Sequence, residues 1–156
     1  MRCGYVALVG RPNAGKSTLF NAFLGQRLSI VTAKPQTTRG RILGIVTDKE
    51  SQIIFIDTPG LLEPSYKLHE SMEKQIEHAS READLALLLL DSVKPRDRFT
   101  LVQRFLEKNR TPTFTLLNKV DLLSEDQIEN LLSNLCNLYK LPDIMPISAL
   151  MNKNLD

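Results

Sequence analysis

Eight residues near the start of the chain restrict its fold more than any other stretch. Gly10 is followed, after four residues, by Gly15, Lys16 and Ser17, so the segment has the spacing Gly-x-x-x-x-Gly-Lys-Ser. An apolar run that predicts a buried strand precedes it, and a segment with helical spacing follows it, which is the setting such a motif requires. A chance glycine-rich turn is the alternative, and the flanking strand and helix argue against it.

The residue types in this segment suit a polyphosphate ligand. Glycines let the backbone approach the phosphate closely and direct N–H groups at its oxygens, and the following helix N-terminus adds a partial positive charge. Lys16 brings a full positive charge, and the hydroxyl of Ser17 is a suitable Mg²⁺ ligand. We expect the nucleotide to contact the whole loop: Gly10, Arg11, Pro12, Asn13, Ala14, Gly15, Lys16, Ser17 and Thr18.

The composition limits the classes of protein that the chain can represent. Its 156 residues fit one domain, and its 42% hydrophobic and 24% charged residues are typical of globular proteins. A net charge of +2 does not favour a nucleic-acid-coating surface. Cys3 and Cys136 lie far apart and predict free thiols in a reducing compartment. The apolar run Leu85–Leu90 is too short to span a bilayer, and no signal-peptide pattern opens the chain.

Alternating strand and helix patterns predict an α/β domain. We expect strands at residues 5–9, 41–47, 52–56, 85–90, 113–117 and 143–147, and helices at 18–24, 68–83, 99–106 and 124–138. The second and third strands form a hairpin, so one strand is antiparallel, whereas the others are parallel with helices on both faces of the sheet. The polar stretch 26–40 has no period and predicts a long exposed loop.

Polar or glycine residues directly follow four of the predicted strands. These residues are Gly10, Asp57, Asn118 and Ser148. Because parallel sheets bind ligands at the carboxyl ends of their strands, we expect the four to line one site.

Asp57 ends a buried apolar run and is followed by Thr58, Pro59 and Gly60. In phosphate-loop NTPases an acidic residue at this point holds Mg²⁺, directly or through a water molecule. A lone Asp after a strand is more often a turn former, but the upstream loop favours the metal. The backbone N–H of Gly60 can approach the terminal phosphate.

The run Asn118-Lys119-Val120-Asp121 predicts the base. A carboxylate at Asp121 can accept hydrogen bonds from N1–H and the 2-amino group of guanine, whereas adenine would leave it unpaired at a cost of roughly 1–3 kcal/mol. Asn118 can join the strand ends, and the stem of Lys119 can cover the base plane. The backbone of Ser148 and Ala149 can offer an N–H to guanine O6, with Leu150 beside it. A polar strand-to-helix turn is the alternative.

Together these motifs resemble the translation-factor-related GTPases and, more narrowly, the Era family of ribosome-associated GTPases. The narrower resemblance rests on residues 4–7, 10–13, 34–39 and 57–61, of which Lys-Pro-Gln-Thr-Thr-Arg at 34–39 discriminates best. It covers essentially the whole chain. The implied fold is the G domain of a P-loop NTPase, with a mixed, mainly parallel six-stranded sheet, helices on both faces and a truncated last helix.

The resemblance implies a switch that binds GTP and GDP with Mg²⁺ and hydrolyses GTP. Residues 26–40 would form the first switch, in which Thr38 meets Mg²⁺ and Thr37 stays open as the alternative. Asp57 and the residues after it would form the second switch, and γ-phosphate contacts would order both. The implied metal ligands are Ser17, Thr38 and Asp57.

Leu61 occupies the place at which small signalling GTPases carry a Gln that orients the attacking water. Since leucine has no hydrogen-bonding side chain, we expect slow intrinsic hydrolysis. Related GTPases compensate with a monovalent cation near the residue matching Asn13, so K⁺ is a further expected cofactor. Arg39 and Arg41 are alternative sources of positive charge. The implied catalytic residues are Lys16, Thr38, Gly60 and Asn13.

Two features depart from the family pattern. Ala14 stands where Val is more usual, a change we expect to be harmless. The chain stops at Asp156, where the last helix should begin, and it lacks the Gly-x-x-Gly loop of the KH RNA-binding domain of full-length relatives. We therefore expect residues 1–156 to be a GTP-binding domain without the KH domain. An apolar patch beside the first and last strands would then lower its stability.

The implied role is small ribosomal subunit assembly and 16S rRNA maturation, with that subunit and rRNA as partners of the full-length protein. We expect a monomer in the bacterial cytoplasm with peripheral association at the inner membrane, and an organellar setting stays open. One alternative is another GTPase of the same class, acting in tRNA modification or as a tandem ribosome-assembly GTPase. A nucleotide-dependent scaffold with negligible turnover is a second alternative, supported by Leu61. A purely RNA-binding module is the weakest interpretation.

Overall fold

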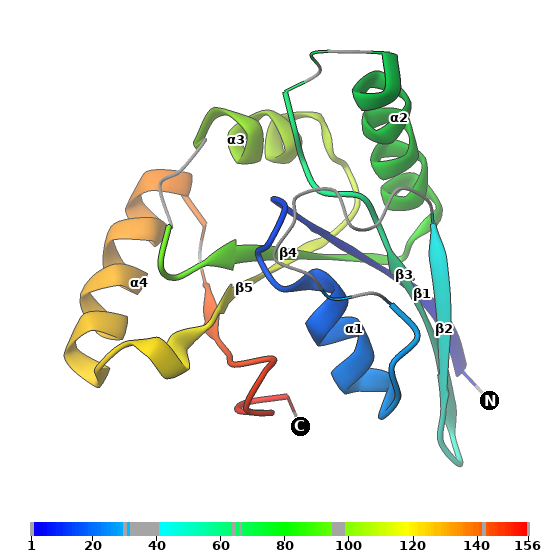
Figure 1. The fold of residues 1–156 in the computed structure, drawn as a ribbon, viewed down its shortest axis with the longest axis horizontal. Coiled ribbons are helices and arrows are strands. Elements are labelled where there is room, and N and C mark those ends of the chain that lie inside the picture. Colours follow the sequence, from blue (N-terminus) through cyan, green and yellow to red (C-terminus); the bar gives the residue numbers. More distant parts are fainter. Residues whose placement is uncertain are drawn as a thin grey trace.

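The structure, a computed structural model, describes residues 2–29, 31, 41–63, 65, 67–94, 99–141 and 143–155. Its elements alternate as the sequence predicts (Figure 1). In chain order they are β1 (Arg2–Gly10), α1 (Lys16–Leu24), β2 (Ile42–Thr47), β3 (Ser51–Asp57), α2 (Lys67–Glu82), β4 (Leu85–Asp91), α3 (Phe99–Lys108), β5 (Thr113–Asn118), the 3-10 turn η1 (Val120–Leu122), α4 (Glu125–Tyr139) and β6 (Met145–Pro146).

The strands form one six-stranded sheet in the order β2-β3-β1-β4-β5-β6. Only the β2–β3 pair is antiparallel, which confirms the predicted mixed, mainly parallel sheet. Residues 51–57 of β3 lie level with residues 2–8 of β1, so that Leu8 is the register partner of Asp57. This register brings the end of β3 beside the loop that leaves β1.

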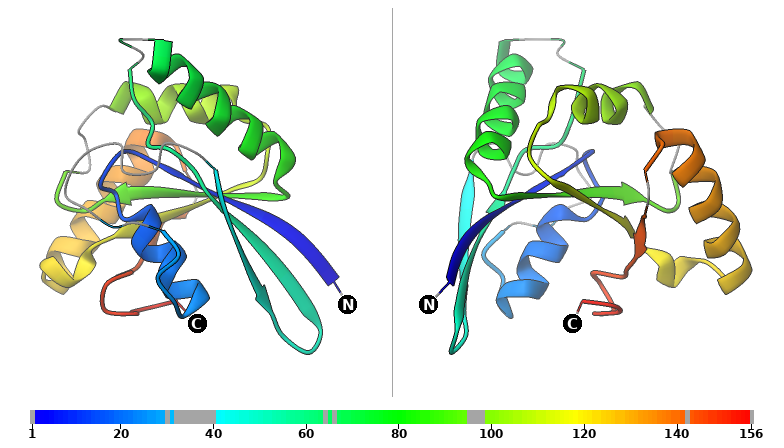
Figure 2. Two further views of the ribbon diagram at one scale, coloured as in Figure 1. Left: turned by 45° about the vertical axis from the view of Figure 1, so that its right-hand side comes forward. Right: turned by 180° about the vertical axis from the view of Figure 1, so that it is seen from behind.

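Helices cover both faces of the sheet, as predicted. In the views of Figure 2, α2 and α3 lie on one side of the sheet and α1 lies on the other. Two buried clusters fill the space between the layers. One cluster joins α2, α3 and α4 to the sheet through Ile76, Val102, Phe105, Leu135 and Tyr139, and the other packs Leu19 and Phe20 of α1 against Leu8 and Phe55.

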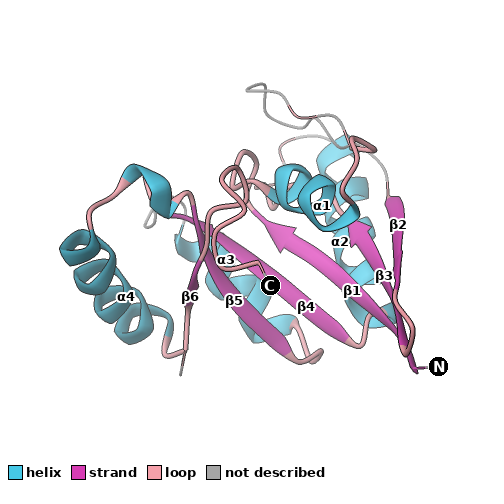
Figure 3. Ribbon diagram, turned by 90° about the horizontal axis from the view of Figure 1, so that it is seen from below, coloured by secondary structure: helices cyan, strands magenta, loops and turns pink. Residues whose placement is uncertain are grey.

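The face that carries α1 is only partly covered. Figure 3 views the sheet from this side, and within the part of the chain that the structure describes no helix lies over β4 and β5. Phe114 of β5 is 42% exposed there, and Leu85 and Met145 are partly buried. The apolar patch expected beside the first and last strands, and its effect on stability, stay predictions.

The boundaries of several elements differ from the sequence-based expectation. Residues 143–147 were expected to form the last strand, but β6 comprises only Met145 and Pro146, paired with Leu116 and Leu117. Pro146 has no N–H with which to extend a ladder. The predicted start of α4 is confirmed, because Ser124 and Gln127 form a reciprocal capping box. Across the described ranges, no helix combines the length and apolar character needed to cross a membrane.

Candidate nucleotide site

The four strand-end residues predicted to share a site do lie at one edge of the sheet. Direct hydrogen bonds join the segments that carry them. The N–H of Leu61, beyond the end of β3, donates to Gly10 O at 2.9 Å. Asn118 at the end of β5 reaches Ala14 in the loop after β1, and the N–H of Ala149 reaches back to Asn118. Hydrogen bonds therefore join four chain segments, far apart in sequence, at one edge of the sheet.

Lys16 is the first residue of α1, directly after the loop that leaves β1. Its side chain is buried, and its ammonium donates to Gly10 O at 3.0 Å and to Arg11 O at 2.9 Å. Burial lowers the pKa of Lys16 to about 8; the negative charge of Asp57 opposes this shift, and the positive charge of Arg11 adds to it. The loop thus holds a buried cation on backbone carbonyls, ready to meet an anion.

Gly15 and Asn118 approach each other so closely that only glycine fits at position 15. A Cβ there would lie 2.0 Å from Asn118 Nδ2, and Gly15 has a φ of +101°. The Asn118 amide donates to Ala14 O at 2.9 Å, and its Oδ1 accepts the N–H of Ala149 at 2.9 Å. Asn118 is 2% exposed, so both interactions are made in the interior. This confirms that Asn118 joins the strand ends.

Oxygen atoms suited to Mg²⁺ meet at the start of α1. Ser17 Oγ donates to Asp57 Oδ2 at 2.8 Å, and Asp57 is fully buried. Hard divalent cations prefer oxygen ligands, and Mg²⁺ usually combines one or two protein groups with water and phosphate oxygens. Within the described residues no three His, Cys, Asp or Glu side chains cluster in a way that could hold a metal. A hydroxyl beside a carboxylate suits an Mg²⁺ ion that completes its coordination with phosphate oxygens and water.

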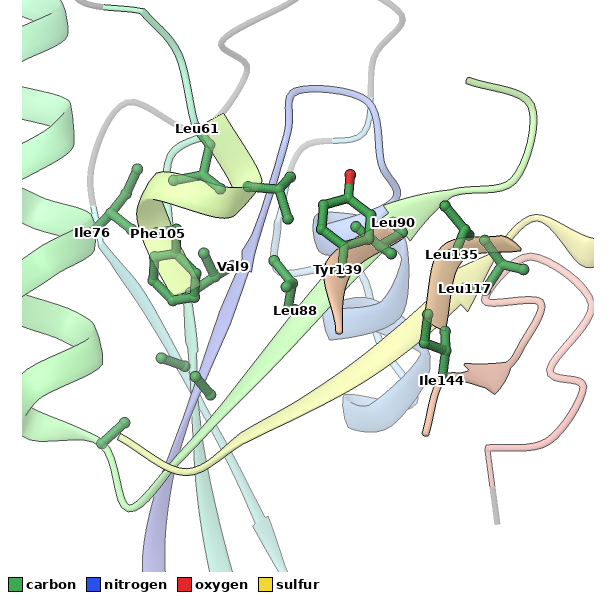
Figure 4. Packing of buried hydrophobic residues seen from close by; sticks show 14 of the residues in the cluster. Val9, Leu61, Ile76, Leu88, Leu90, Phe105, Leu117, Leu135, Tyr139 and Ile144 are labelled. Atoms are coloured by element: carbon green, nitrogen blue, oxygen red, sulfur yellow. The ribbon is translucent and has the colours of Figure 1, made fainter. Parts of the chain in front are cut away.

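The residues after Asp57 differ in what their side chains contact. The Thr58 hydroxyl is buried and donates to Leu8 O at 2.6 Å, so it fixes the end of β3 against β1. Gly60 approaches Pro12, and a Cβ on it would lie 2.7 Å from Pro12 Cγ. The Leu61 side chain is 9% exposed and lies with Ile76 in the cluster beneath α2 and α3 (Figure 4).

The carboxylate predicted to select the base is held by a second loop. Ser148 Oγ donates to Asp121 Oδ1 at 2.5 Å, and it also accepts the N–H of Met151 at 3.1 Å. The N–H groups of Ser148 and Ala149 donate to Lys153 O and Asn118 Oδ1, so both already have partners inside the chain. Leu150 beside them is 75% exposed.

Lys119 is supported by the end of β4. Its backbone has a φ of +69°, its ammonium lies 2.6 Å from Asp91 Oδ2, and its carbonyl accepts the Ser92 hydroxyl at 2.9 Å. The sequence did not single out Asp91 or Ser92. Polar residues at the end of a strand are common, and nothing around these two indicates that they contact Lys119. The ion pair holds the Lys119 stem at the edge of the site.

The remaining predicted switch residues cannot be placed. Thr37, Thr38 and the motif at 34–39 lie outside the described residues. Asn21 and Ser29 were not predicted but belong to the site, because Ser29 Oγ donates to Asp57 Oδ2 at 2.6 Å and Asn21 holds the backbone of Ser29. Neither residue belongs to a sequence motif. They are identified only by the contacts that the loop after α1 makes in the structure.

A family model described as "50S ribosome-binding GTPase" matches residues 5–119, which contain the phosphate loop, Asp57 and Asn118. The chain belongs to this family.

Curated relatives confirm the narrower resemblance. GTPase Era of Ruminiclostridium cellulolyticum is 42% identical over 156 residues, a match that covers 99% of this chain and 52% of the relative. GTPase Era of Clostridium acetobutylicum is 42% identical over 158 residues, covering 99% of this chain and 53% of the relative. The chain therefore spans about half the length of the curated relatives that it matches.

Solved structures of similar proteins confirm the G-domain fold. One is Era in complex with MgGDPNP and nucleotides 1506–1542 of 16S ribosomal RNA; it has a TM-score of 0.90 and 39% identity, with coverage of 100% of this chain and 54% of the other. Era from Aquifex aeolicus bound to GDP·AlF4⁻ gives a TM-score of 0.89 at 40% identity, with coverage of 100% and 54%. NFeoB from S. thermophilus bound to GDP·AlF4⁻ and K⁺ has a TM-score of 0.75 and 27% identity. The match covers 97% of this chain and 57% of the other.

Proposed function

We propose that this chain binds GTP and GDP together with Mg²⁺ and hydrolyses GTP as a molecular switch. The observation that carries the proposal is the position of Asp121. Ser148 holds its carboxylate, and Asn118 ties the same edge to the phosphate loop that contains Lys16. A nucleotide whose phosphates meet Lys16 therefore extends toward a carboxylate that distinguishes guanine from adenine.

Different residues of the site would contact the phosphates and the Mg²⁺ ion. Lys16 stabilises negative charge on the outer phosphates, and its burial strengthens this interaction because the local dielectric is low. Ser17 and Asp57 would hold Mg²⁺, which supplies charge neutralisation at the phosphates when bound. Gly60, packed on Pro12, would direct its N–H at the terminal phosphate. Thr38 is proposed as the further metal ligand on the basis of the family resemblance.

Hydrolysis is expected to be slow, and Leu61 gives the reason. Its side chain packs into the cluster beneath α2 and α3, so it neither orients water nor stabilises developing charge. We propose that K⁺ beside Asn13 supplies part of the missing charge. Asn13 lies in the phosphate loop with a φ of +63°, and its amide oxygen is a suitable ligand for a hard cation. The NFeoB neighbour crystallised with K⁺ supports this assignment.

The cellular role is proposed from the relatives. Era proteins match 99% of the chain, and one solved Era holds a segment of 16S ribosomal RNA. We propose that the switch acts in assembly of the small ribosomal subunit and maturation of its rRNA. In this proposal the RNA partner belongs to the full-length protein, whose length is about twice that of this chain.

Turnover of GTP and ATP, each measured in K⁺ and in Na⁺, tests the proposal. We expect hydrolysis of GTP and none of ATP, with a faster rate in K⁺. Equal turnover of the two nucleotides would contradict the role of Asp121, and equal rates in the two salts would contradict the K⁺ site near Asn13. Tight GDP binding without turnover in either salt would favour the alternative of a nucleotide-dependent scaffold, which the burial of Leu61 supports.

A further inference from the structure

Ser29 lies in the loop that follows α1, within the stretch predicted to form the first switch. It is 5% exposed, and its hydroxyl donates to Asp57 Oδ2 at 2.6 Å. A serine this deeply buried in a connecting loop is unusual, because loops mostly run over the surface. Its hydroxyl makes a charge-assisted hydrogen bond, which is stronger than one between neutral groups.

Asn21 fixes the backbone of this serine. From the middle of α1, its Nδ2 donates to Ser29 O at 2.8 Å, and its Oδ1 accepts the N–H of Ser29 at 2.9 Å. The same Oδ1 accepts the N–H of Leu28 at 3.0 Å. One amide side chain therefore satisfies both backbone groups of Ser29, so the position of its hydroxyl is set by α1.

Two hydroxyls from opposite ends of α1 thus meet one carboxylate oxygen. Ser17 at the start of the helix lies 2.8 Å from Asp57 Oδ2, and Ser29 beyond its end lies 2.6 Å from the same atom. A carboxylate oxygen has two lone pairs, so two donors from different directions define its orientation. Because each hydroxyl gives its proton to Asp57, the oxygen of Ser17 keeps its lone pairs for a cation.

We infer that Ser29 is a positioning residue for Asp57 and that it sets the Mg²⁺ affinity of the nucleotide complex. The inference rests on the proposed guanine-nucleotide function. Without the Ser29 hydroxyl, Asp57 Oδ2 loses one of the two hydroxyl donors that orient it, so we expect binding of Mg²⁺ to cost more ordering of this carboxylate. The Asn21–Ser29–Asp57 chain also connects the predicted first switch to the start of the second through contacts that involve no nucleotide.

The test is the Mg²⁺ concentration at which the protein retains fluorescently labelled GDP, measured on Ser29→Ala, Ser29→Thr and the unaltered chain. We expect Ser29→Ala to need about tenfold more Mg²⁺, as a lost hydrogen bond to a charged group predicts. GDP affinity with Mg²⁺ chelated should stay unchanged, because the Ser29 hydroxyl is engaged with Asp57. Ser29→Thr keeps a hydroxyl and should restore the original Mg²⁺ requirement.

Ser80→Ala is the matched control, since Ser80 is 2% exposed in α2 and its Oγ has no hydrogen-bond partner among the described residues. It should leave the Mg²⁺ requirement unchanged. If Ser29→Ala does not fold, Asn21→Ala replaces it and should shift the requirement in the same direction by about threefold. An unchanged Mg²⁺ requirement in Ser29→Ala would overturn the inference. An equal loss of GDP affinity with and without Mg²⁺ would also overturn it. Failure of the unaltered chain to retain GDP would instead contradict the proposed function.

Discussion

The two ends of the candidate nucleotide site are built in different ways. At the phosphate end, a buried ammonium rests on backbone carbonyls, and the conformation of the loop depends on Gly15. At the base end, side chains hold other side chains, as Ser148 holds Asp121 and Asp91 holds Lys119. The first arrangement suits any nucleoside triphosphate, whereas the second can distinguish bases. Affinity and selectivity are therefore expected to respond to different substitutions.

The largest effect expected is loss of affinity at the phosphate end. Lys16→Ala removes the buried cation and leaves the Gly10 and Arg11 carbonyls without it. We expect GDP binding to weaken by about 3–5 kcal/mol, or roughly a thousandfold, as when one partner of a buried charge pair is removed. Calorimetry measures this, with Lys49→Ala on the exposed β2–β3 turn as the control. Binding within a factor of three of the unaltered chain would contradict the assignment.

At the base end the expected change is selectivity. Asp121→Asn replaces an acceptor-only carboxylate with an amide that also donates, which suits the extra carbonyl of xanthine. We expect GDP affinity to fall by about 2–3 kcal/mol, roughly a hundredfold, and XDP affinity to rise. Competition between GDP and XDP measures the exchange, and Asp126→Asn on the exposed first turn of α4 is the matched control. An equal loss for both nucleotides would show that Asp121 supports the fold and does not contact the base.

The same division explains what the sequence could predict. The phosphate loop and the Asn-Lys-x-Asp run are local motifs at strand ends, so the parallel sheet alone brings them to one edge. Ser29 contacts Asp57 and Asp91 contacts Lys119, and in each pair the two residues are 28 positions apart in the sequence. The fold brings these residues together, so their pairing cannot be predicted from local sequence. Neither Ser29 nor Asp91 belongs to a motif. The last strand comprises only Met145 and Pro146. Pro146 has no N–H for the ladder, so the apolar run at 143–147 predicts a longer strand than the backbone donors allow.

Solution pH also probes the phosphate end, because the pKa of its buried lysine, Lys16, is lowered. Burial lowers the pKa of Lys16 to about 8, and a bound phosphate raises it again because negative charge favours the ammonium. Binding above that pH therefore takes up a proton. We expect GDP affinity to fall about tenfold between about pH 7.5 and about pH 9.

The control for this titration is Lys16→Arg, which stays charged throughout. Lys16→Arg should bind GDP more weakly, and its affinity should change less with pH. Subtracting its pH profile from that of the unaltered chain removes the contribution of nucleotide ionisation. Parallel profiles for the two proteins would mean that proton uptake occurs elsewhere, for example at the base end.

The smallest effect is expected at Leu61. This residue lies at the phosphate end, but its side chain packs in the apolar cluster. Leu61→Gln supplies the residue type that orients water in small signalling GTPases, but the side chain at this position lies in the cluster beneath α2 and α3. Burying an amide there without a partner should lower the free energy of unfolding by about 1 kcal/mol. We therefore expect a melting temperature lower by about 2–4 °C and no gain in GTP turnover. Leu61→Met keeps an apolar side chain of similar volume and should preserve both values. A faster Leu61→Gln enzyme would place residue 61 beside the phosphates in the reacting state, which would require the second switch to leave the packing described for Leu61.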